Sequence, residues 1–300
     1  VMKNMEYLGC EIMNLKESMP KCNLLEVNLE KEILEISLNR IEVYNALNPE
    51  LIQELINIFS WAANNCAATA HSLGSESGET LPRVIILKGN GKHFCAGADI
   101  NWMKDSGEAT LEENQKDAKR LDELFYGIWS NPCFTIGLIK GVALGGGAGL
   151  VACLDHVIAM DGSKIAMSEI KLGILPAVIG PYVYKRLGSA QFRRLAMLGS
   201  RINTDEALRI GFIDEIAKDE KDLEINCNKI ISQILTSAPS AIEQAKLLCK
   251  TFDDWNGNMM ELRDHTLKTT SVMRGGKEGQ EGLGAFIERR DPDWYVSNEE

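Results

Sequence analysis

The sequence predicts an α/β fold in which a mostly parallel sheet is built from alternating strands and helices. Three short apolar runs, residues 84–87, 135–139 and 157–160, have the length and continuity of strands that are buried on both faces. The segments between these runs contain a long amphipathic helix at about 111–130 and an apolar helix that ends near residue 154. Such strand–helix–strand alternation predicts parallel strands joined by right-handed crossovers.

The chain before this core predicts a pair of strands and a helix. Apolar residues alternate with polar ones at Leu25, Val27 and Leu29, and again over 34–38, which is typical of two antiparallel strands. A helix is expected to end near Asn64, because Asn48 can cap its start and Pro49 suits its first turn. Residues 67–82 are small and polar and predict a surface loop.

The chain beyond residue 180 is predicted to be helical. Thr204 is expected to cap one short helix, Pro239 to open a second that runs to about residue 252, and residues 259–272 to form a third. The α/β core therefore carries a helical region at its C-terminal side.

Composition excludes several classes of protein. A net charge of −11 argues against non-specific nucleic-acid binding, which needs excess Lys and Arg. The eight cysteines are spread singly, which predicts reduced thiols and a cytoplasmic location, and the four histidines are too scattered for a zinc site. No stretch approaches ~18 consecutive apolar residues, so no membrane span is expected, and residues 1–22 lack the apolar core of a secretory signal.

Two loops and one acid predict a chemical site. The loops at 93–100 and 141–147 each follow a buried strand, and ligands in open α/β sheets bind beyond the carboxyl ends of strands. The glycines at 145–147 allow close backbone approach, and N–H groups at a helix start can stabilise an oxygen that becomes negative. Glu169 lies in an apolar stretch about twenty residues later and could move protons. The pattern predicts carbonyl polarisation combined with proton transfer, although a packing turn and a surface acid are the plainer alternatives.

These segments resemble the crotonase (enoyl-CoA hydratase/isomerase) superfamily in content and in order. The matching pieces are LNR at 38–40, NAL at 45–47, FCAGADI at 94–100, ALGGGAGL at 143–150, SEIKLGILPA at 168–177, GSRINTDEALRIGFIDEI at 199–216 and EGLGAFIERRDPDW at 281–294. The resemblance implies a spiral of ββα units followed by a helical trimerisation region. It divides the chain into an N-terminal extension at 1–22, a core with the CoA and acyl site at 23–215, and a C-terminal helical region at 216–300.

The resemblance also implies an acyl-CoA substrate and no cofactor or metal beyond the coenzyme A that the substrate carries. By matching position, the backbone amides of Ala98 and Gly146 are expected to hold the thioester oxygen, and Glu169 is expected to be the catalytic acid. The expected substrate-binding positions are Ala96 for the adenine, Asp99 as the residue that fixes its loop, Gly145 in the glycine turn and Ala177 for the reacting water. The family usually forms homotrimers or dimers of trimers.

One departure from the family pattern leaves the reaction open. Hydratases of the family carry two glutamates, and Gly149 stands where the first would be. A single acid suffices for a double-bond shift and can serve hydration in principle. The segment ILPAVIGPYV resembles methylglutaconyl-CoA hydratase-like members, so we expect a hydratase for a branched or carboxylated enoyl-CoA, with an isomerase and a non-catalytic binding homologue as alternatives. The candidate cations for a substrate carboxylate are Lys104, Lys171, Arg186 and Arg194, and a glutamate is expected to be tolerated at position 149.

Overall fold

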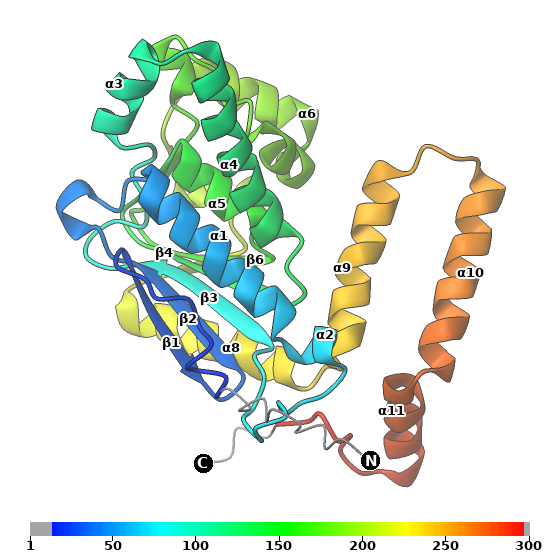
Figure 1. Ribbon diagram of the computed structural model, residues 1–300. Helices are drawn as coiled ribbons and strands as arrows, with labels where there is room; N and C mark the ends of the chain where they lie inside the picture. The colour runs from blue at the N-terminus through cyan, green and yellow to red at the C-terminus, as the bar shows by residue number, and fades with distance from the viewer. Residues whose placement is uncertain (1–13, 297–300) are drawn as a thin grey trace, which may run out of the picture.

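Residues 14–296 are described by a computed structural model and are organised around two β-sheets (Figure 1). The larger sheet has the strand order β1-β2-β3-β4-β6-β9. Its strands are β1 (Leu25–Glu30), β2 (Ile33–Leu38), β3 (Val84–Gly89), β4 (Phe134–Ile139), β6 (His156–Met160) and β9 (Glu215–Ala217). In this sheet the β1–β2 pair is antiparallel and every other pair is parallel. The predicted α/β class and the predicted antiparallel pair of strands at its N-terminal side are therefore confirmed.

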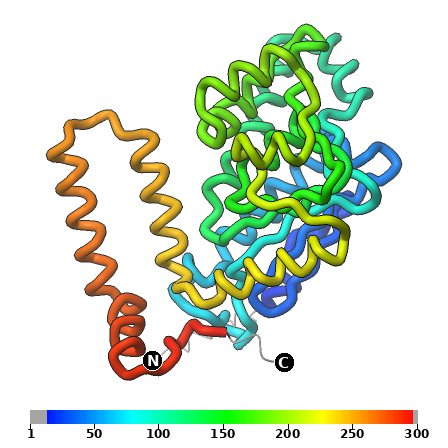
Figure 2. Tube along the Cα trace, turned by 180° about the vertical axis from the view of Figure 1, so that it is seen from behind, coloured from blue at the N-terminus to red at the C-terminus, as the bar shows by residue number. Residues whose placement is uncertain are grey.

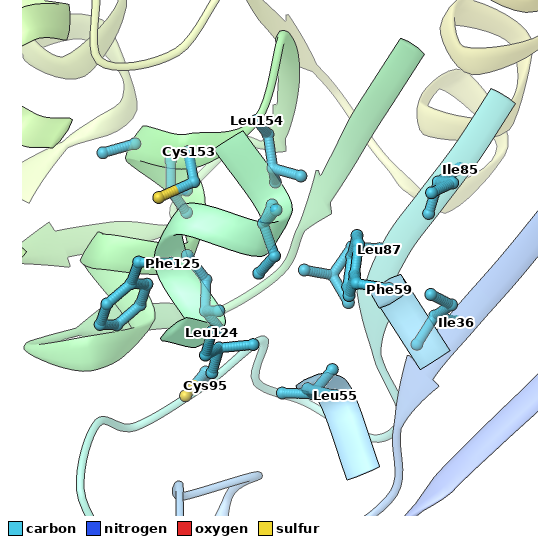
Figure 3. Close-up of a cluster of buried hydrophobic side chains, with 14 of the residues drawn as sticks. Ile36, Leu55, Phe59, Ile85, Leu87, Cys95, Leu124, Phe125, Cys153 and Leu154 are labelled. Carbon is cyan, nitrogen blue, oxygen red and sulfur yellow. The ribbon is translucent and has the colours of Figure 1, made fainter. Parts of the chain in front are cut away.

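Helices cover both faces of this sheet. On one face lie α1 (Pro49–Asn64), α4 (Leu111–Trp129) and α5 (Gly146–Cys153), whose apolar side chains meet Ile85 and Leu87 in the main core (Figure 3). On the other face lies α8 (Glu220–Leu235), which packs on a second cluster that includes Val84 and Ile86. The apolar run in β3 is continuous because its alternate side chains enter two different cores.

The smaller sheet connects the glycine turn to the rest of the molecule. It consists of β5 (Val142–Leu144), β7 (Lys164–Ala166) and β8 (Ile202–Asn203), in the order β5-β7-β8. Strands of two or three residues carry no detectable periodicity, which is why the sequence did not predict them. β5 leads directly into α5 and so fixes where that helix begins.

Three local predictions need correction. The segment 67–82 is only partly a loop, since α2 (Ala67–Ala70) forms at its start. A helix that the sequence did not predict, α3 (Ile100–Glu108), follows the loop after β3. In α7 (Thr204–Arg209), the cap is Asn203, whose side chain accepts from the Glu206 N–H, while Thr204 is already helical. In contrast, Asn48 caps α1 as predicted, through the Leu51 N–H.

The last part of the chain forms a helical arm. After α6 (Gly180–Leu198) and α8, the helices α9 (Pro239–Asp254) and α10 (Met259–Gly275) make a hairpin that projects away from the sheet, and α11 (Lys277–Glu288) follows at its base (Figures 1 and 2). α10 contributes no buried residue. The predicted C-terminal region begins at 216, yet α8 lies within it and packs on the sheet, so the arm proper starts at α9. Among residues 14–296, no helix has both the length and the apolarity to cross a bilayer.

Candidate active site

The two loops predicted to share a site run side by side in the structure. A parallel bridge joins Cys95 to Ala143. The Cys95 N–H donates to the Val142 carbonyl at 3.0 Å, and the Leu144 N–H donates to the Cys95 carbonyl at 3.0 Å. The loop after β3 is therefore attached to β5, the strand that delivers the glycine turn. Cys95 itself is fully buried, and burial raises the pKa of its thiol to about 12, as expected of a packing residue rather than a nucleophile.

A second bridge orients the backbone of Ala98. The Leu47 N–H donates to the Gly97 carbonyl at 2.7 Å, and the Asp99 N–H donates to the Leu47 carbonyl at 2.8 Å. Because successive N–H groups of an extended chain point to opposite sides, this pairing turns the N–H of Ala98 away from Leu47. That N–H has no hydrogen-bond acceptor among residues 14–296.

An ion pair between Arg40 and Asp99 anchors the loop that carries Ala98. Asp99 accepts from Arg40 Nη2 at 2.9 Å through one oxygen and from the Asn101 N–H at 2.9 Å through the other, which caps α3. Both side chains are largely buried, with exposed fractions of 12% for Arg40 and 9% for Asp99. Burial by itself raises the pKa of Asp99, but the hydrogen bonds and the charge of Arg40 outweigh it and hold the pKa below its usual value. This carboxylate therefore ties the loop to Arg40 and to the first turn of α3.

The glycine turn requires glycine at two of its positions. Gly145 has φ 49° and ψ −116°, a conformation that residues with a side chain rarely adopt, and its N–H donates to the Ala166 carbonyl at 2.8 Å. A Cβ at Gly147 would lie 2.5 Å from the Cys95 carbonyl oxygen, so only glycine allows the two loops to approach this closely. Gly146 is the first residue of α5, and its N–H has no acceptor in the described part of the chain.

Glu169 lies beside the glycine turn. It opens a short 3₁₀ helix, η2 (Glu169–Leu172), and is half-buried. The position that a Cβ of Gly145 would occupy is 3.3 Å from Glu169 Oε1 and 3.9 Å from the Cα of Gly97, so the acid and both loops meet at one place. Glu169 Oε2 is buried without a hydrogen-bond partner among residues 14–296, and burial raises the pKa of this carboxyl.

The structure brings together Ala98, Gly145, Gly146 and Glu169, with Asp99 beneath them. Ala96 lies on the same loop and donates its N–H to the Tyr44 carbonyl at 3.0 Å. Ala177 is exposed on the segment that links η2 to α6, and no hydrogen bond joins it to the other predicted positions within the described residues.

The surroundings of Gly149 overturn one expectation. A Cβ at this position would lie 2.4 Å from Ile179 Cγ2 and 3.0 Å from Phe125 Cε1. The expectation that a glutamate is tolerated at 149 conflicts with this packing, because the first atom of any side chain would overlap Ile179 and press tightly on Phe125. Ile179 comes from the segment before α6, so the sequence around Gly149 contains no sign of it.

Two residues of the site lay in motifs to which the sequence assigned no role. The backbone of Leu47 bridges Ala98, and its side-chain Cδ1 would lie 2.8 Å from a Cβ at Gly146, so this one residue adjoins both candidate amide positions. Arg40 anchors Asp99. Both stand in the segments LNR and NAL, whose presence in the family pattern was the available signal.

The four candidate cations differ in what they already bind. Arg186 pairs with Asp214 at 2.6 Å and also donates to backbone carbonyls, and Arg194 pairs with Glu206 at 2.7 Å. Lys104 and Lys171 are exposed and form no ion pair with residues 14–296. Of these four candidates, the two lysines are therefore the ones that no ion pair within the described residues occupies.

Comparison with known proteins gives consistent matches over most of the chain. A protein-family model described as enoyl-CoA hydratase/isomerase matches residues 28–297. The chain is 31% identical over 265 residues to the enoyl-CoA isomerase/hydratase fer4 of Mycosarcoma maydis, covering 87% of this chain and 91% of that protein. It is 25% identical over 272 residues to the 2,3-dehydroadipyl-CoA hydratase of Escherichia coli (strain K12), covering 90% and 98%. The solved structure of an enoyl-CoA hydratase from Shewanella pealeana ATCC 700345 superposes with a TM-score of 0.83 at 31% identity, covering 93% of this chain and 98% of that one.

Proposed function

Since this chain belongs to the crotonase (enoyl-CoA hydratase/isomerase) superfamily, we propose that it is a hydratase for a branched or carboxylated enoyl-CoA that works with one catalytic glutamate. The observation that carries the proposal is the position of Glu169. Its carboxylate lies against Gly145, with one buried oxygen that has no partner in residues 14–296. A half-buried acid with one buried, unpartnered oxygen at the meeting point of two such loops is suited to proton transfer.

The thioester oxygen is held by the N–H groups of Ala98 and Gly146 in this proposal. Two features support it: the bridge with Leu47 turns the Ala98 N–H outward, and the Gly146 N–H opens α5. Donors fixed in this way stabilise the enolate oxygen that forms in the transition state, and each typically contributes about 3 kcal/mol.

Glu169 then moves the protons in both directions. As a carboxylate it takes a proton from water, and the hydroxide adds to the β-carbon of the conjugated thioester while the enolate forms. The protonated Glu169 next returns that proton to the α-carbon, which restores the carbonyl. The raised pKa of Glu169 favours this cycle because it brings the acid nearer to the working pH. Ala177 is proposed to orient the water through its backbone, on the strength of the family resemblance alone.

The space beside Gly149 supports a mechanism with a single acid. Ile179 and Phe125 occupy the volume into which a second acid at position 149 would extend. The same observation favours the second candidate function, a double-bond isomerase, since removing and returning one proton on the same face needs only one carboxylate.

A carboxylate on the substrate would require a cation near the site. Lys171 lies two residues after Glu169 in η2, and Lys104 lies in α3 just beyond the Asp99 loop. The relative named 2,3-dehydroadipyl-CoA hydratase acts, by its name, on an acyl chain that ends in a carboxylate. We therefore assign Lys171 or Lys104 to such a group, with Lys171 preferred because it shares a short helix with the acid.

The arm is proposed to hold the protein in homotrimers or dimers of trimers. Its exposed apolar side chains include Met259, Met260 and Leu267 on α10 and Phe286 and Ile287 on α11, of which Phe286 is 83% exposed. Exposed apolar side chains in this number, on an arm whose helix α10 has no buried residue, support an interface with other copies of the chain.

The test is a panel of enoyl-CoA esters followed by ultraviolet absorbance of the conjugated thioester. The panel contains a straight-chain 2-enoyl ester, a methyl-branched one, a methylglutaconyl ester and a 3-enoyl ester. We expect the highest kcat/KM with the methylglutaconyl ester and a selective loss of that preference in Lys171→Ala, with Lys104→Ala as the comparison. Turnover of the 3-enoyl ester without hydration of the others would establish the isomerase instead.

A further inference from the structure

Two buried thiols lie together outside the active site. Cys66 follows α1 and Cys133 precedes β4, and their exposed fractions are 1% and 2%. Both residues line a cavity of about 10 Å³, whose other walls include Pro82, Pro239 and Ile242. This volume is close to the space of one water molecule, so two thiols share a site that holds little else.

The contacts of the two sulfurs differ. Cys66 Sγ lies 3.4 Å from Thr69 Oγ1 and 3.7 Å from the Ala63 carbonyl, while Cys133 Sγ lies 3.8 Å from the Pro82 carbonyl. Both residues line the same small cavity, which places the two thiol groups beside each other. Neither thiol is in a disulfide, so the pair is reduced as the structure shows it.

The pKa of Cys66 is shifted in the opposite direction from the pKa values of the other buried cysteines. The neighbouring Cys133 thiol lowers the pKa of Cys66 against the opposing effect of burial, and the neighbouring Cys66 thiol raises the pKa of Cys133. Burial raises the pKa of Cys95, Cys153 and Cys227, none of which has a thiol partner among the described residues. A thiolate is the reactive form of cysteine, so the pair contains one sulfur suited to attack and one suited to resolve.

We propose that Cys66 and Cys133 form a peroxide-sensitive dithiol that closes reversibly into a disulfide. The Cys66 thiolate attacks one oxygen of hydrogen peroxide, the O–O bond breaks, and the hydroxide that leaves takes up a proton, giving a sulfenic acid and water. The Cys133 sulfur then attacks the Cys66 sulfur, the S–S bond forms, and the S–O bond breaks. The second hydroxide leaves with the Cys133 proton as water, so two thiols and one peroxide give one disulfide and two waters.

The pair lies at the point where the arm joins the core. Lys246 of α9 donates to the Cys133 carbonyl at 2.8 Å and pairs with Asp155 at 2.6 Å, while α9 also packs on α2, which starts beside Cys66 (Figure 1). A disulfide between the two cysteines would link the α1–α2 connection to the α4–β4 connection directly beneath α9. The walls of the cavity include Pro82 and, from α9, Pro239 and Ile242, so hydrogen peroxide reaches the two thiols through a local opening between α9 and the core.

The first experiment maps the cysteines of the intact protein. The wild type is treated with stoichiometric hydrogen peroxide, unfolded, alkylated and digested, and its peptides are identified by mass spectrometry. We expect a loss of about 2 Da, the mass of two hydrogen atoms, together with a Cys66–Cys133 linked peptide that a thiol reductant removes. Cys249→Ser, which removes the exposed thiol of α9, should give the same result. Alkylation of both Cys66 and Cys133 after peroxide treatment overturns the proposal.

The second experiment separates the attacking sulfur from the resolving one. Cys133→Ser should accumulate a sulfenic acid at Cys66, which dimedone labels, whereas Cys66→Ser should leave Cys133 unlabelled. Circular dichroism checks that both variants are folded. If one variant is unfolded, the cysteine mapping of the wild type still tests whether the disulfide forms. Labelling of Cys133 in Cys66→Ser at the level of Cys66 in Cys133→Ser overturns the assigned roles.

Discussion

Ile179 fills the place that a side chain at Gly149 would need. Its Cγ2 atom lies 2.4 Å from the point where a Cβ of residue 149 would stand, well inside the contact distance of two carbon atoms. The two residues come from different helical segments and meet only because α5 and α6 pack against each other. The glycine at position 149 is thus required by the packing of Ile179 around it. The lack of a second acid at this position therefore involves neighbouring residues as well as Gly149 itself.

Substitution at position 149 should cost stability. Gly149→Ala is expected to lower the free energy of unfolding by about 1–3 kcal/mol, the usual cost of overpacking a core, measured by urea denaturation. Gly127→Ala is the matched control, because nothing lies within 4 Å of its Cβ position in α4, and it should be neutral or slightly stabilising. In the Ile179→Ala background the Gly149→Ala change should cost less, and an unchanged cost would contradict the assigned clash.

Loss of the Glu169 carboxylate should abolish turnover while the protein stays folded. Glu169→Gln keeps the shape of the side chain but removes proton transfer, so kcat should fall by at least about 100-fold. The measurement is enoyl thioester absorbance, with acyl-CoA binding by calorimetry as the check on the site. If the variant turned over as fast as the parent, Glu169 would have no part in the mechanism.

Glu169→Gln should also raise the free energy of unfolding at neutral pH, but not in acid. Burial raises the pKa of Glu169, so the native state holds this proton more tightly than the unfolded chain does. Its contribution is most favourable below the unfolded value of about 4.3 and is lost as the pH rises through the native pKa. Glu169→Gln, which cannot ionise, should therefore exceed the parent in free energy of unfolding at neutral pH, and the difference should vanish in acid. Urea denaturation across this range measures it, and parallel pH profiles would contradict it.

The Arg40–Asp99 pair should support both the fold and the position of Ala98. Arg40→Met leaves a buried carboxylate without its partner, which is expected to cost about 3–5 kcal/mol in the free energy of unfolding. Lys88→Met breaks the more exposed Lys88–Glu35 pair and should cost less than about 1 kcal/mol. We further expect kcat of folded Arg40→Met to fall more than its KM rises, because the loop that presents the Ala98 N–H loses its anchor. Equal stability losses in the two variants would count against this role.

A charge on the arm should dissociate the proposed oligomer. Phe286→Asp places a carboxylate in the apolar patch of α11, and light scattering should show a shift from trimer toward monomer. Ile225→Asp adds the same charge to an exposed apolar position on α8 and should leave the assembly unchanged. A wild-type protein that is monomeric at micromolar concentration would refute the oligomer itself.

Local patterns predicted most of the elements that frame the site. The alternation over 25–29 and 34–38, the cap at Asn48 and the continuous run at 84–87 each encode their structure within a few residues. The short strands of the second sheet and α3 escaped prediction, because two or three residues carry no period and α3 has no buried residue to mark a face. The residues themselves singled out the glycine turn at 145–147 and Glu169, and the family resemblance then assigned roles to Ala98, Gly146 and Glu169. Their catalytic roles, the domain boundaries and the cytoplasmic location remain predictions.

The sequence by itself determined the α/β class, the order of the main strands and helices, and membership of a family through motifs that occur in order. Only the tertiary structure decided that Ile179 occupies the space beside Gly149, that Arg40 anchors Asp99, and that Cys66 meets Cys133. The reason is physical. Propensity, capping and glycine conformation depend on neighbours within one or two turns, whereas these contacts join residues 30 or more positions apart, whose approach depends on how whole elements pack.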